Sequence, residues 1–134
     1  MTPASAPPHD PATARAAILD RMAAAARAAG RDPAAVTLTA VSKQQPWDRV
    51  EPVLAAGQRV FGENRVQEAA ERWGERDLPG LELRLIGPLQ TNKAPQAVSL
   101  FHVIETLDRP KLARALADAA ARRGALPRLL VQVN

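Results

Sequence analysis

The sequence predicts an α/β protein whose parallel strands form part of a (β/α)8 barrel. Short apolar runs rich in β-branched residues alternate with helical segments, which is typical of parallel strands joined by right-handed crossovers. The runs are apolar at successive positions, as expected where both faces of a sheet are covered. A doubly wound open sheet fits the same alternation. A polar residue or glycine ends each predicted strand, however, and this favours the barrel, because barrel sites are assembled at that rim.

The predicted elements follow in order along a single domain over residues 11–134, preceded by a flexible tail over residues 1–10. Asp10 before Pro11 predicts an N-cap and the first position of a helix that ends at Gly30. About five strand–helix units follow. The predicted strands are residues 36–41, 59–61, 81–86, 101–106 and 129–133, and the predicted helices between them are residues 47–56, 65–73, 91–100 and 109–123.

Composition excludes several classes of site. The chain has 134 residues with no cysteine, no tyrosine and two histidines. Disulfides, thiolate zinc sites, cysteine nucleophiles and tyrosine acid–base chemistry are therefore excluded, and we expect no metal site.

Charge and hydropathy bear on partners and location. The net charge is +4, but the arginines are scattered among acidic residues and aromatic residues make up only 3% of the chain. We therefore expect no nucleic-acid partner. No apolar run approaches the ~20 residues that cross a bilayer, so we expect no membrane partner. The first residues lack the features of a secretory signal, and a cytoplasmic protein is expected.

Lys43 follows the first predicted strand after Ser42, at the rim of the predicted sheet, although lysine is rarely fully buried. In a partly desolvated pocket its pKa would fall, and the neutral amine could then form a Schiff base with an aldehyde. A lysine that extends from the strand end into solvent is the alternative. Spacing alone favours neither.

Two further strand ends carry hydrogen-bonding groups. At the second, Gly62 allows close backbone approach and Asn64 offers both a donor and an acceptor to a ligand. Asn64 could instead cap the next helix. The third strand end, residues 86–93, could be a binding loop or a turn that caps the helix after it.

These motifs occur in an order that resembles the pyridoxal phosphate homeostasis protein family, which is similar to the amino-terminal barrel domain of alanine racemase (fold type III). The resemblance covers nearly all of the chain after residue 11. It rests on the strings AVSK at residues 40–43, FGENRVQE at 61–68, IGPLQTNK at 86–93, IETLD at 104–108 and VQVN at 131–134.

The resemblance implies a protein of vitamin B6 homeostasis that binds pyridoxal 5′-phosphate (PLP). Lys43 would hold the cofactor as an internal aldimine, with Asn64 facing the same pocket. It also implies a carrier or regulator without established turnover, and no catalytic residue is assigned. A racemase-type Schiff-base enzyme acting on small amino or keto acids is the alternative. The absence of tyrosine argues against it.

The chain departs from the family pattern in two places. Its third strand reads Leu-Arg-Leu-Ile-Gly over residues 83–87, where relatives usually have Trp-His-Phe-Ile-Gly. Relatives are also longer, and a barrel usually needs about 250 residues. The family's phosphate-binding residues lie in that further portion. The chain is therefore expected to be an incomplete, C-terminally truncated barrel, monomeric like the family, with exposed strand edges that favour association.

Overall fold

The computed structural model describes residues 10–134, which form two compact units. The predicted tail, apart from Asp10, lies outside the described residues. One unit holds residues up to 38 together with 46–58, and the other holds residues 39–45 and 59–134. The first contains the helices α1 (Pro11–Ala28), η1 (Pro33–Ala35, a 3-10 helix) and α2 (Trp47–Ala55).

The first unit begins as the sequence predicts. Asp10 caps α1, its side chain accepting from the backbone N–H of Thr13 at 3.2 Å, and Pro11 is the first helical residue. Gly30 follows the helix with a φ of 71°, the left-handed conformation that glycine adopts without penalty. Arg15 links α1 to the end of α2, donating to the side chain of Gln58 at 2.9 Å.

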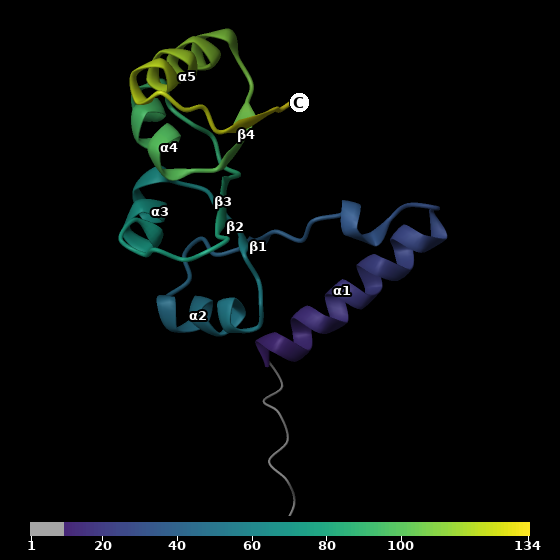
Figure 1. Ribbon diagram of the computed structural model, residues 1–134. Helices are drawn as coiled ribbons and strands as arrows, with labels where there is room; N and C mark the ends of the chain where they lie inside the picture. Colours follow the sequence, from purple (N-terminus) through teal and green to yellow (C-terminus); the bar gives the residue numbers. More distant parts are fainter. Residues whose placement is uncertain (1–9) are drawn as a thin grey trace, which may run out of the picture. The chain divides into compact units, whose positions relative to one another are not determined.

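The second unit is a five-stranded sheet in which every paired strand is parallel and the strand order follows the sequence. Helices α3, α4 and α5 stack along one side of these strands (Figure 1). The elements are β1 (Ala40–Val41), β2 (Val60–Glu63), α3 (Val66–Trp73), β3 (Glu82–Leu85), the 3-10 helix η2 (Thr91–Lys93), α4 (Ala94–Leu100), β4 (Val103–Leu107), α5 (Pro110–Arg123) and β5 (Arg128–Val131).

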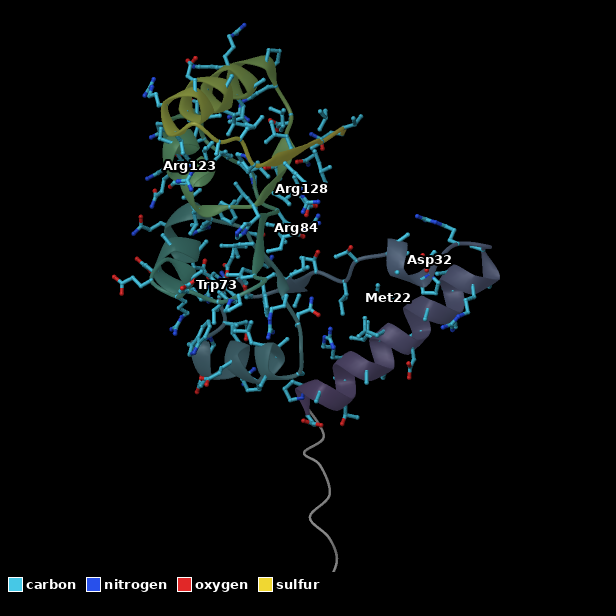
Figure 2. The ribbon with its side chains drawn as sticks, in the orientation of Figure 1. Met22, Asp32, Trp73, Arg84, Arg123 and Arg128 are labelled. Atoms are coloured by element: carbon cyan, nitrogen blue, oxygen red, sulfur yellow. The ribbon has the colours of Figure 1, made fainter. Side chains whose placement is uncertain are left out.

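The core of this unit lies between the sheet and its helices. Leu83 and Leu85 of β3 are almost fully buried, and so is Phe61 of β2, whose ring centroid lies 4.8 Å from that of Trp73 on α3. Alternate residues of a strand point to opposite faces. Arg84 therefore lies on the face away from the helices, where it contacts Glu82 and Glu105. Figure 2 shows Arg84 and Arg128 on that side and Trp73 on the helix side.

Sequential parallel strands covered on one side by α3–α5 are the arrangement of a (β/α)8 barrel, and a doubly wound sheet would place helices on both faces. The predicted fold class, an incomplete barrel of parallel strands, is confirmed.

Two predicted elements differ from the structure. The strand predicted over residues 36–41 is reduced to β1, and η1 ends just before Val36. A strand forms only where it pairs with another strand. Ala40 pairs with Phe61, and β2 begins only one residue before that, at Val60, so most of the predicted strand lies beyond the start of its partner. The helix predicted over residues 91–100 divides into η2 and α4. Pro95 lies in the first turn of α4, where its missing N–H costs nothing.

Candidate functional site

The carboxyl ends of the parallel strands lie at one edge of the sheet, and the predicted site residues follow them. Lys43 comes two residues after β1, Asn64 directly after β2, and the loop over residues 86–90 directly after β3. Because β1, β2 and β3 are neighbours, with strands about 4.8 Å apart, the structure brings these segments together.

Lys43 occupies a tight turn. The backbone N–H of Gln45 donates to the carbonyl of Ser42 at 3.1 Å, which makes Lys43 and Gln44 the central residues of a β-turn. Gln44 has a φ of 60°, a conformation that is uncommon outside glycine. Lys43 is exposed.

Asn64 lines a cavity of about 560 Å³ between the loops that follow β2 and β3. The residue that caps α3 is Arg65, with no side-chain hydrogen bond, so Asn64 does not serve as the helix cap considered above. Among the described residues, no acidic side chain lines the cavity, and Lys43 is not one of its lining residues. The polar groups around it come from Asn64, Arg65, Gln67, Gln90 and Lys93.

The loop after β3 is fixed against Asn64 by close backbone approach. A Cβ added to Gly87 would lie 2.3 Å from the carbonyl oxygen of Asn64, so only glycine fits here. The carbonyl of Gly87 accepts from the Thr106 hydroxyl at 2.8 Å, and the carbonyl of Leu89 accepts from the Arg109 guanidinium at 2.8 Å. These contacts tie the cavity wall to β4 and to the start of α5.

A buried carboxylate underlies this edge of the sheet, and sequence reasoning missed it. The Glu63 side chain is 0% exposed. It accepts from the Ser42 hydroxyl at 2.6 Å, from the Trp73 indole N–H at 2.8 Å and from Arg72 Nη1 at 2.7 Å. A buried charge is tolerated only when paired and hydrogen-bonded in this way. Glu63 stands at the carboxyl end of β2, where a polar residue is ordinary, so its position in the chain carries no signal of burial.

Arg72 joins this carboxylate to a second one. Its Nη2 donates to Glu68 at 3.0 Å, and its Nε donates to the carbonyl of Gln45 at 2.9 Å. Burial acts to lower the pKa of the Arg72 guanidinium, but the hydrogen bonds with Glu68 and Glu63 outweigh it and the pKa is raised. The backbone N–H of Gln44, and then Arg72, hold the pKa of Glu68 below its usual 4.5.

Within residues 10–134, no group of three or more histidine, aspartate or glutamate side chains is placed to hold a metal ion. None of the described helices combines the length and apolar character needed to cross a membrane.

The fold and the residues at the carboxyl edge of the sheet define the class of protein. It is part of a parallel (β/α) barrel that carries a lysine and an asparagine at the ends of neighbouring strands. No family model matches the chain. It is 41% identical over 124 residues to the pyridoxal phosphate homeostasis protein of Escherichia coli K12, covering 89% of this chain and 52% of the relative. For the Pseudomonas aeruginosa protein of the same name the identity is 45% over 122 residues, with the same coverage.

Solved structures agree with these relatives. PipY of Synechococcus elongatus PCC7942, determined with PLP bound, matches with a TM-score of 0.73 and 43% identity, over 87% of this chain and 54% of PipY. A protein from Bifidobacterium adolescentis matches with a TM-score of 0.77 and 31% identity, over 90% of this chain and 53% of that one. The resemblance to the pyridoxal phosphate homeostasis protein family is thus confirmed over the matched residues. The chain spans about half the length of the curated relatives it matches.

Proposed function

We propose that this chain binds pyridoxal 5′-phosphate through Lys43, with Asn64 beside the cofactor, and contributes to vitamin B6 homeostasis. One observation carries the proposal. Lys43 and Asn64 follow neighbouring parallel strands at the same edge of the sheet, in a chain 43% identical to a protein solved with PLP bound. The family strings AVSK and FGEN supply both residues.

The chemistry of the residues at this edge fits the cofactor. Bound PLP supplies an aldehyde, which condenses with a primary amine and releases water. Lys43 offers such an amine in an exposed turn. Asn64 offers an amide donor and acceptor. The described residues that line its cavity include Arg65 and Lys93 but no acidic residue, which suits an anionic molecule.

The proposed role of the chain is to hold the cofactor without turning over a substrate. We propose that it acts in the cytoplasm. Holding PLP needs an amine and a shaped site, whereas racemisation needs placed acid and base groups. The chain has no tyrosine to serve as such a base, and its curated relatives are named for homeostasis. Exchange of an amino acid's α-proton into D2O, catalysed by the chain, would contradict this role and favour the racemase-type enzyme.

A spectroscopic titration tests the proposed binding. Purified chain mixed with PLP should develop the visible absorption of the lysine-bound cofactor, and Lys43→Ala should abolish it. Lys111→Ala is the matched control, because it removes an exposed lysine on α5 that does not line the cavity. Equal absorption by the Lys43→Ala variant and the unmodified chain would show that the lysine is wrongly assigned.

A further inference from the structure

The turn that carries Lys43 is held by a network of charged side chains to which no function has been assigned. The turn spans Ser42–Gln45, and three of its groups bind charged side chains outside it. These are the Ser42 hydroxyl, the Gln44 backbone N–H and the Gln45 carbonyl. They flank Lys43 on both sides in the chain.

Each of these groups has a charged partner. Glu63, at the end of β2, accepts from the Ser42 hydroxyl at 2.6 Å. Glu68, on α3, accepts from the Gln44 N–H. Arg72 lies one turn further along α3 and donates to the carbonyl of Gln45 at 2.9 Å.

Arg72 binds both of the carboxylates and so joins the three partners into a single unit. Arg72 donates to Glu63 at 2.7 Å and to Glu68 at 3.0 Å. Glu63 is fully buried and the Arg72 side chain is only 10% exposed. Such charges keep a fixed geometry because every alternative leaves one of them unpaired away from water.

The backbone of the turn requires external support. Gln44 has a φ of 60° at the third position of the turn, where glycine or asparagine is the usual residue. Non-glycine residues persist in this conformation only where their surroundings over-determine it, and they cluster at active sites and ligand clamps. Here the support is the bond from the Gln44 N–H to Glu68.

We infer that Glu68 and Arg72, anchored on Glu63, are positioning residues that hold the Ser42–Gln45 turn in the conformation that presents Lys43 to its aldehyde ligand. The inference rests on the proposed function, since it names the groups that orient the same lysine. None of the three acts on the ligand itself.

The matched variants are Glu68→Ala and Glu71→Ala, which lie on the same helix. Glu71 is exposed and its side chain bonds Gln67 instead of the turn. With PLP, we expect the rate constant for the appearance of the lysine-bound absorption to fall about tenfold in Glu68→Ala, because a misplacement of ~1 Å can cost up to ~100-fold. Glu71→Ala should leave the rate unchanged, and Glu68→Gln, which keeps an acceptor oxygen, should restore most of it.

Two further readouts separate positioning from folding and need no PLP. Acetic anhydride should label Lys43 at the same rate in all variants, because the side chain is exposed and a small reagent needs no orientation. Hydrogen exchange at the Gln44 amide, measured by NMR, should accelerate about fivefold in Glu68→Ala with the loss of its hydrogen bond.

The inference is overturned if the Gln44 amide exchanges equally in Glu68→Ala and Glu71→Ala, or if both variants react with PLP at the unmodified rate. Its failure is distinguishable from failure of the proposed function. Persistence of the absorption in Lys43→Ala would remove the proposed function, whereas the Gln44 amide would still report whether the turn is held by Glu68.

Discussion

Replacing Arg72 with methionine should destabilise the chain through the carboxylate that it leaves behind. The substitution keeps an unbranched, flexible side chain and removes the guanidinium group with its charge. Glu63 would then remain 0% exposed, with hydrogen bonds from Ser42 and Trp73 but no cation. Breaking a buried ion pair by removing one partner costs about 3–5 kcal/mol. Because two donors remain, we expect the lower end, about 3 kcal/mol.

Urea denaturation of the unmodified chain and the variant measures this loss as a difference in the free energy of unfolding. Arg84→Met is the matched control. Arg84 also binds two carboxylates, but those of Glu82 and Glu105 are 26% and 28% exposed. Partly exposed pairs contribute little, so we expect a loss below about 1 kcal/mol.

A double variant isolates the buried charge. Adding Glu63→Gln to Arg72→Met removes the carboxylate that the first change leaves unpaired, so the double variant should lose less stability than the two single losses added together. Equal losses for Arg72→Met and Arg84→Met, or simple additivity in the double variant, would show that the buried Glu63 carboxylate does not depend on Arg72.

Three other outcomes are expected. The pKa of Glu68 is held below 4.5, chiefly by the Gln44 N–H, so the contribution of Glu68 to stability is complete above pH 4.5 and is lost as the pH falls through the lower pKa of the folded chain. An NMR titration of the Gln44 amide should have its midpoint below pH 4.5, and a midpoint at or above that pH would contradict the contact. Gly87→Ala should lower stability by more than ~1 kcal/mol and shift the NMR signals of Asn64, because a Cβ would overlap the Asn64 carbonyl at 2.3 Å; unshifted signals would contradict this. Val131 on the edge strand β5 is 72% exposed, and Val131→Lys should reduce the association of chains with one another in sedimentation velocity. Unchanged association would contradict a role for this strand edge.

Local signals predicted the fold well. Asp10 and Pro11 mark the start of α1, and Gly124, with a φ of 83°, ends α5 where the sequence places its stop. Such caps act within one turn of chain, so they can be identified from neighbouring residues alone. The alternation of strands and helices then places Lys43 and Asn64 at one edge, because all five strands are parallel.

Long-range partners could not be predicted in the same way. The strand expected over residues 36–41 has partners only at its end, because β2 starts late. Glu63 reads as an ordinary polar residue until Arg72 and Trp73 of α3 fold against it. The positive φ of Gln44 leaves no trace in the sequence, since the residue is not glycine and its support comes from Glu68, 24 positions away.

Covalent trapping shows most directly whether the Lys43 amine holds the cofactor. Reducing the chain with borohydride in the presence of PLP makes the lysine bond permanent, and peptide mass mapping then identifies the modified residue. We expect modification of the peptide that contains Lys43 at one equivalent per chain. Modification confined to Lys93 or Lys111, or spread evenly over all three lysines, would contradict it.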